Sequence, residues 1–132
     1  MKPLDCIEKR DLLAAQKFDP EKVRAYADAY LREGRHGDAF EFYRKLGDVK
    51  GVTAVKEACI REAEPDVLWQ VEKSFPDLVS REDWITCGEN AMRMGKYRCA
   101  AYAFQHARDD ERLARAEAAF KVSGSPQVPP AN

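Results

Sequence analysis

The chain has 132 residues, of which 45% are apolar and 34% charged, a balance that suits one folded domain rather than a disordered polymer. Its 22 basic and 23 acidic residues leave no positive excess to attract nucleic acid, so we expect no nucleic-acid partner. The chain has no run of about 18 apolar residues and the N-terminal MKPLDCIEKRDLL lacks the apolar core of a signal peptide. We therefore expect no membrane partner and a cytoplasmic location.

The cysteines give no pattern of a metal or redox site. Cys6, Cys59, Cys87 and Cys99 form no CxxC pair, and the chain has only two histidines. A structural zinc site needs about four ligands, usually in close pairs. Cys99 and His106 are seven residues apart, about 10 Å along a helix, which is too far for a nucleophile and its base. We expect free thiols, no metal, no cofactor and no catalytic residue.

Helix start and stop signals define the first two predicted helices. Asp5 is a good N-cap for a helix that runs to about Gln16. Asp19 followed by Pro20 is a strong signal for the start of a second helix, because proline suits the first helical position. Gly34 suits the end of this helix, where a left-handed residue is common.

The third and fourth predicted helices are separated by a short turn. The third ends at Gly47, and Asp48 caps the fourth. Apolar residues recur on both at three- and four-residue intervals, which is helical spacing. The residues expected on their inner faces are Ala39, Phe40, Tyr43, Leu46, Val49, Val52, Val55 and Cys59.

Proline residues bound the fifth predicted helix, which begins at Pro65 and ends before Pro76. Ser80 is a good N-cap for the sixth, and Asp83 stands at the capping-box position three residues later. The sixth helix is expected to run to about Gly95.

Two further helices and a tail complete the chain. The seventh helix is expected over 97–107, and either Asp109 or Asp110 caps the eighth, which ends near Gly124. The eighth helix is expected to turn Leu113, Ala116 and Phe120 inward. The last residues, 124–132, contain three prolines and no apolar rhythm, so we expect a disordered tail after a single domain over 1–123.

An internal repeat is the main organising feature. Residues 19–59 align without a gap to residues 80–120 at an offset of 61, with six identities in 41 positions. The match is informative because shared residues fall at expected turns, close helix contacts and caps. They include Arg32 with Arg93, Gly34 with Gly95, Ala39 with Ala100 and Asp48 with Asp109, and Tyr43 aligns with Phe104. Repeats of this length are typical of stacked helical hairpins.

The second copy, DWITCGENAMRMGKYRCAAYAFQHA, resembles a tetratricopeptide repeat (TPR). Its motif roles fall on Trp84, Cys87, Gly88, Gly95, Tyr97, Ala100, Phe104 and Ala107. It departs from the motif at Cys87, where leucine is usual, and at Ala91, where tyrosine is usual. The period of 61 also exceeds the family's 34, because a shorter hairpin at about 49–75 separates the copies. The resemblance implies an all-α fold in which antiparallel hairpins stack as a short right-handed α-solenoid of about eight helices.

The resemblance also implies a concave groove lined by the first helix of each copy. Its residues here are Arg24, Asp28, Leu31, Arg32, Ile85, Glu89, Met92 and Arg93. Asp28 and Glu89 stand where the family's carboxylate clamp has asparagine, so they argue against binding of a partner's terminal carboxylate. The alternative interpretation is that these charges pair within their own helices at four-residue spacing.

These features lead to a functional hypothesis. We expect a non-enzymatic protein-interaction module, a scaffold or adaptor, that binds a peptide or helix of another protein. A small regulatory ligand-binding domain and a self-associating structural protein stay open as alternatives. Most aromatic residues are expected in the core, whereas Phe42 and Tyr102 lie off the inner faces and are candidates for exposed contacts.

Overall fold

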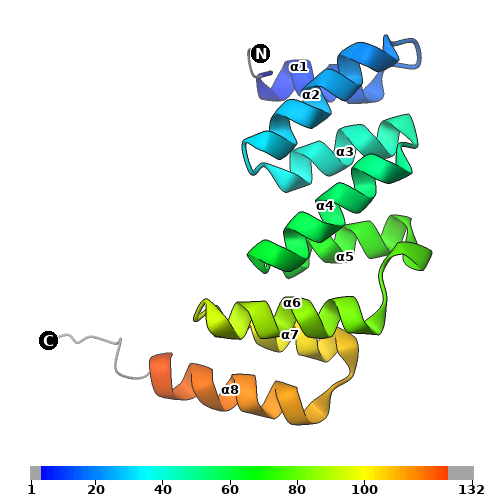
Figure 1. Ribbon diagram of the computed structural model, residues 1–132. Helices are drawn as coiled ribbons and strands as arrows, with labels where there is room; N and C mark the ends of the chain where they lie inside the picture. The colour runs from blue at the N-terminus through cyan, green and yellow to red at the C-terminus, as the bar shows by residue number, and fades with distance from the viewer. Residues whose placement is uncertain (1–3, 125–132) are drawn as a thin grey trace, which may run out of the picture. The chain divides into compact units, whose positions relative to one another are not determined.

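The computed structural model describes residues 4–124, and this range contains α-helices, one 3₁₀ turn and no strand (Figure 1). No helix in this range has the length and apolar character needed to cross a membrane. The elements are α1 (Cys6–Ala14), α2 (Pro20–Arg32), α3 (His36–Leu46), α4 (Val49–Glu62), α5 (Pro65–Ser74), η1 (Pro76–Leu78), α6 (Arg81–Arg93), α7 (Tyr97–Ala107) and α8 (Asp110–Gly124).

The chain divides into two compact units, Met1–Ala58 and Cys59–Asn132. The first unit holds α1, α2, α3 and most of α4, and the second holds the end of α4 and all later helices. The disordered tail is predicted over residues 124–132. Gly124 instead ends α8, and residues 125–132 lie outside the described residues.

Local signals set the helix ends of the first unit as predicted. Asp5 accepts a hydrogen bond from the Glu8 N–H and completes a capping box. Asp19 caps α2 with proline at its first position. Gly34 and Gly47 have φ values of +79° and +66°, a left-handed conformation that glycine adopts without a Cβ clash.

The core of the first unit is centred on α3, which is buried on more than one side. Phe40, Phe42 and Tyr43 are each at most 3% exposed. The prediction that Phe42 is an exposed contact is therefore wrong. Its ring stacks on Tyr30 with centroids 5.6 Å apart, because aromatic residues of α2 cover this face of α3.

The turn into α4 brings α4 close to α3. Asp48 caps α4 as predicted, since one of its oxygens accepts from the Gly51 N–H at 3.1 Å. Gly51 lies flat against Tyr43, and a Cβ there would stand 2.1 Å from the ring. Val52 and Val55 are fully buried, whereas Val49 is 50% exposed, so its predicted inward position is wrong. Val49 is the first residue of α4, where the helix has only begun to cover its neighbours.

The helix starts of the second unit also follow local signals. Ser80 and Asp83 form the predicted capping box at the start of α6. Asp109 rather than Asp110 caps α8, and it accepts from the Arg112 N–H at 3.0 Å. That hydrogen bond and the Arg112 guanidinium hold the pKa of Asp109 below its usual range.

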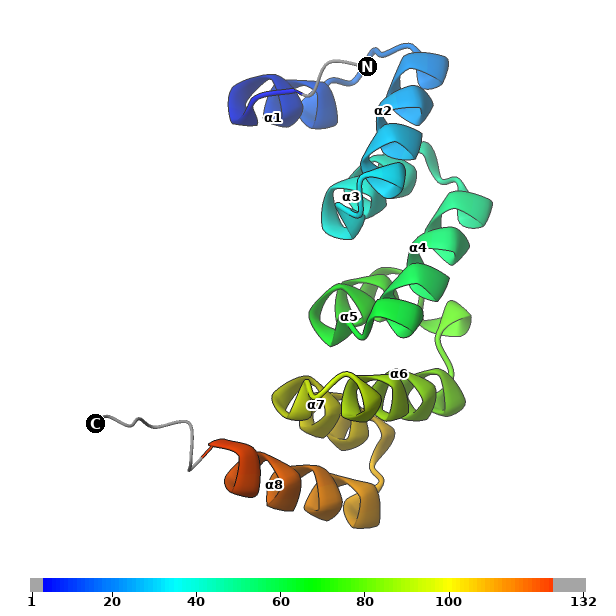
Figure 2. The same cartoon turned by 60° about the vertical axis from the view of Figure 1, so that its left-hand side comes forward.

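The second unit is built on contacts of α7 with both α6 and α8 (Figure 2). Phe104 forms a buried cluster there with four alanines: Ala63, Ala91, Ala100 and Ala116. A Cβ at Gly88 would stand 2.4 Å from Phe104, so α6 and α7 approach closely because this position lacks a side chain. Trp84 is 2% exposed, whereas Phe120 is 43% exposed, so the predicted inward position of Phe120 is wrong.

Helix bounds in the two units coincide at the offset of 61. Residues 20–32 of α2 correspond to 81–93 of α6, and 36–46 of α3 correspond to 97–107 of α7. The starts of α4 and α8, at 49 and 110, keep the same offset. The same local plan therefore occurs once in each unit.

Candidate functional site

The predicted groove residues on α2 are partly used inside the first unit. Asp28 accepts a hydrogen bond from the Tyr43 hydroxyl. Arg24 donates at 3.2 Å to the carboxylate that caps α4. Leu31 is half-buried and Arg32 is exposed. The two charged residues Arg24 and Asp28 therefore pair with α3 and the α3–α4 turn, not with each other along α2.

The predicted groove residues on α6 have similar internal partners. Glu89 accepts from the Arg112 guanidinium of α8 at 2.7 Å. Arg93 donates to the side-chain amide three residues earlier. Ile85 and Met92 are half-buried. These four residues belong to the second unit and those of α2 to the first, so one continuous groove stays a prediction.

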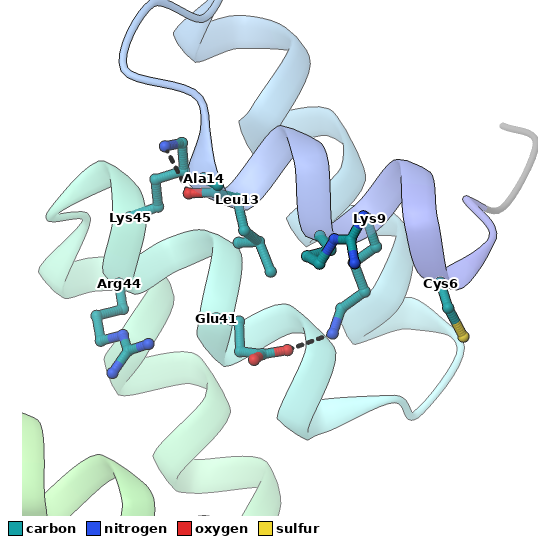
Figure 3. A pocket seen from close by; sticks show the side chains of 8 residues that line it. Cys6, Lys9, Leu13, Ala14, Glu41, Arg44 and Lys45 are labelled. Atoms are coloured by element: carbon teal, nitrogen blue, oxygen red, sulfur yellow. Dashed lines mark hydrogen bonds and ion pairs between the residues drawn. The ribbon is translucent and has the colours of Figure 1, made fainter.

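A pocket of about 610 Å³ lies between α1 and α3 (Figure 3). Its polar side chains hold α1, a helix with no buried residue. Lys9 pairs with Glu41 and, at 2.8 Å, with Asp38. Burial opposes the charge of Lys9, but these hydrogen bonds raise its pKa. Since these groups already attach α1, we assign the pocket a structural role. Its lining is Cys6, Lys9, Arg10, Leu13, Ala14, Glu41, Arg44 and Lys45.

A second attachment of α1 comes from Lys45. Its ammonium donates to the carbonyls of Leu13 and Ala15, at 2.9 and 2.6 Å, and lies 4.2 Å from the centroid of the Phe18 ring. The last carbonyls of a helix lack partners within the helix, and a cation there also complements the helix dipole. Lys45 is therefore a C-cap supplied to α1 by another helix.

A groove of about 670 Å³ lies between α7 and α8. Ala101 and Leu113 line it and pack on the core of the second unit. Two large apolar side chains that line the groove are partly exposed to solvent: Tyr102 is 38% exposed and Phe120 is 43% exposed. The exposure of Tyr102 confirms its predicted outward position. Its charged residues are Arg98, Glu117 and Lys121.

An aromatic cluster surrounds His106, which lies on α7. The imidazole centroid lies 4.3 Å from Trp84, 4.6 Å from Trp69 and 4.7 Å from Tyr102. The Trp84 indole N–H donates to Glu72 at 3.0 Å. Burial lowers the pKa of His106, and the negative charge of Glu72 opposes that shift. The cluster therefore favours the neutral imidazole.

A further pocket of about 580 Å³ adjoins this cluster, between α5 and the end of α7. Gln105 lines both this pocket and the α7–α8 groove. Tyr102 lines the groove and contacts His106, which lines the pocket. We call the groove and this pocket together the α7 surface. The lining of the pocket is Trp69, Glu72, Lys73, Pro76, Gln105, His106 and Arg108.

The buried thiols are poor nucleophiles. Burial raises the pKa of Cys87 to about 12. Burial and the nearby Glu64 raise the pKa of Cys59 as well. Since the thiolate is the reactive form, both groups stay protonated near neutral pH.

Sequence reasoning missed the convergence of three helices on His106. Part of the signal was available, because Tyr102 and His106 are four residues apart on one helix and therefore neighbours on its surface. Trp69 and Trp84 come from α5 and α6, and no spacing rule brings them to the same ring. Their contact depends on how these helices pack.

Comparison of the chain with protein-family models, with curated proteins and with solved structures gives no match. The functional argument therefore depends on the geometry of the α7 surface.

Proposed function

We propose that this protein is a non-enzymatic protein-interaction module, a scaffold or adaptor, that binds a segment of a partner protein on the α7 surface. The observation that carries the proposal is the groove between α7 and α8, where Tyr102 and Phe120 stand open beside an apolar lining. Aromatic side chains in a pocket are the anchors that dominate protein interfaces. The proposed site lies on the second helix of the hairpin rather than on α2 and α6.

The proposal includes a TPR-like arrangement of stacked hairpins in the cytoplasm. It is supported by the helix bounds that coincide at the offset of 61 and by the glycine turns at Gly34 and Gly95. A single hairpin buries its apolar face only by stacking on another, which is the physical basis of helical repeat proteins.

The non-enzymatic part of the proposal is supported by how the chain uses its reactive groups. The carboxylates of Asp48 and Asp109 cap helices. Burial keeps the thiols of Cys59 and Cys87 protonated. His106 has aromatic rings around it rather than a nucleophile to activate.

The test compares capture of proteins from native lysate by four forms of the domain. Phe120→Ala removes the groove anchor, and Val122→Ala is its matched control, because Val122 is 73% exposed and lies outside the groove lining. A double variant, Arg32→Glu with Arg93→Glu, probes the α2 and α6 faces. Circular dichroism must first show that all forms are equally folded.

A partner that the wild type and Val122→Ala retain and Phe120→Ala loses, and that binds again as a purified protein, supports the proposal. Loss with the arginine double variant alone places the site on α2 and α6 instead. If no protein distinguishes the forms, the interaction proposal is wrong. Sedimentation and small-ligand screening then address self-association and ligand binding, the two alternatives.

A further inference from the structure

Arg108 has an unusual backbone for its residue type. It follows the last residue of α7 with φ 56° and ψ 43°, in the left-handed region. At the offset of 61 the equivalent residue is Gly47, with φ 66°. Glycine adopts this conformation freely, whereas an L side chain brings its Cβ close to the next carbonyl. An outlier of this kind is a reason to ask what the side chain does.

Ala63 is the other residue of this kind in the described range, and it serves the fold. Its φ is 58°, its side chain is fully buried, and it belongs to the core cluster of the second unit. Arg108 differs, because its side chain is exposed and lines the pocket between α5 and α7. Packing therefore explains alanine at position 63 but does not explain arginine at position 108.

The pocket that Arg108 lines contains a second cationic side chain. Lys73 lines the same pocket, and its ammonium lies 5.6 Å from the centroid of the Trp69 ring. Among residues 4–124, neither Arg108 nor Lys73 has a carboxylate partner at ion-pair distance. Glu72 lines the pocket too, but one of its oxygens accepts from the Trp84 indole.

The α7 surface as a whole also carries more positive than negative side chains. Its two hollows are lined by four Lys or Arg residues and two Glu residues, and Gln105 joins them. This contrasts with the full chain, where acidic residues slightly outnumber basic ones. The complementary occupant is negatively charged, and the apolar groove beside it requires apolar side chains in the same occupant.

We propose that the α7 surface binds an acidic peptide segment of a partner protein, with one partner carboxylate held between Arg108 and Lys73 beside Trp69. The inference rests on the proposed function and adds the chemistry of its partner. The planar guanidinium takes a carboxylate through two parallel hydrogen bonds, and the ammonium adds a point charge. An apolar residue of the same segment then enters the groove against Phe120.

The experiment uses three synthetic peptides with the same apolar residues. In the Glu peptide, Leu-Phe pairs alternate with Glu-Glu pairs. The Gln peptide has Gln in place of every Glu, and the Lys peptide has Lys in place of every Glu. Binding to the full chain is followed by NMR through the indole N–H signals of Trp69 and Trp84 and the imidazole of His106. We expect the Gln peptide to bind about tenfold more weakly than the Glu peptide, as expected for loss of one charge-assisted hydrogen-bond pair.

Variants test whether the pocket cations cause that difference. Arg108→Gly removes the guanidinium and suits the left-handed backbone, so it lowers affinity for the Glu peptide without lowering thermal stability. Lys73→Gln lowers the affinity as well, and Arg108→Lys retains part of it. Arg115→Gln is the charge-matched control, because Arg115 is exposed on α8 and lines neither hollow.

Equal affinity of the Glu and Gln peptides, equal affinity of Arg108→Gly and wild type, or no binding of any peptide would overturn the inference. Failure of this inference can be distinguished from failure of the proposed function. If Phe120→Ala weakens both the Glu and the Gln peptide equally while Arg108→Gly changes neither, the groove binds a peptide but not through its charge. If the capture experiment also finds no partner that depends on Phe120, the proposed function fails independently.

Discussion

The segments α2–α3–α4 and α6–α7–α8 follow one local plan with different interiors. The first lies in the first unit except for the end of α4, and the second lies in the second unit. The bounds of their first two helices and the start of the third coincide at the offset of 61, although only six of 41 aligned residues are identical. Among the shared residues, Gly34 and Gly95 both have a positive φ after their helices. Ala39 and Ala100 are both fully buried, and Asp48 and Asp109 both cap the next helix.

The cores of the two segments differ in which residues pack against the aligned rings of Tyr43 and Phe104. Tyr43 lies against Gly51 of the following helix, whereas Phe104 lies against Gly88 of the preceding one. Each ring occupies the space that a glycine provides by having no side chain, but the glycine comes from a different neighbouring helix in each segment. The comparison shows that turns and caps determine where helices begin and end, while the volume of the core has several solutions.

The two segments differ most in stability at their first inward position, which holds Trp84 in one and Val23 in the other. Both side chains are buried, but the indole removes far more surface from water. We expect Trp84→Ala to lower the free energy of unfolding by about 3–5 kcal/mol. Val23→Ala is expected to lower it by about 2 kcal/mol. Urea unfolding followed by circular dichroism measures both, and equal losses would contradict the comparison.

The next effect tests the two glycine contacts. Gly88→Ala places a methyl group against Phe104, and we expect a loss of about 1–3 kcal/mol despite the better helix propensity of alanine. Gly51→Ala is expected to act similarly through Tyr43. Adding Phe104→Leu should restore part of the loss in Gly88→Ala and none in Gly51→Ala. Thr86→Ala, at an exposed position of α6, is the control for propensity. Absence of this selective rescue would show that the contacts are not limiting.

A smaller effect concerns position 45, which aligns with position 106. Lys45 caps α1, whereas His106 joins aromatic rings. Lys45→Met should lower the free energy of unfolding by about 1 kcal/mol and remove the hydrogen-exchange protection of α1 in particular. Lys50→Met, at an exposed position of α4, should leave that protection unchanged. Unchanged exchange of α1 in the first variant would show that other contacts suffice.

Positions 47 and 108 both have a left-handed backbone, and exchanging glycine and arginine there should change the free energy of unfolding with opposite signs. Arg108→Gly should raise the free energy of unfolding by about 0.5–1 kcal/mol, because it relieves the Cβ clash. Gly47→Arg should lower it by about 1 kcal/mol for the same reason. Thermal unfolding followed by circular dichroism checks both signs, and a less stable Arg108→Gly would mean that the arginine supports the fold.

We expect a weak pH dependence of stability in the segment α6–α7–α8. The pKa of His106 is lowered in the folded protein from its usual 6.5, so between the two values the unfolded chain binds more protons. The contribution to stability is therefore full above about pH 6.5 and is lost as the pH falls toward the folded value. The fluorescence of Trp69 and Trp84, the only tryptophans, reports the same titration because both contact His106. His106→Gln should remove both dependences.

The positions of the helices follow from local patterns in the amino-acid sequence. The seventh helix was predicted at 97–107, as observed, and caps at Asp5, Asp19 and Ser80 were identified. These features are local, because a cap or a left-handed glycine depends on residues within one turn of it. The alignment of the two copies also predicted that Ala39 and Ala100 are small residues facing a neighbouring helix, and both are fully buried.

The packing of the helices determines which faces are covered and which charges are paired. Phe42 is buried because aromatic residues of α2 cover it, and Phe120 is open although its helix pattern points inward. Arg24 pairs with Asp48 rather than with its helix neighbour Asp28. Such outcomes depend on side chains that come from other helices. Periodicity identifies the faces of one helix, but it contains no information on what lies opposite each face.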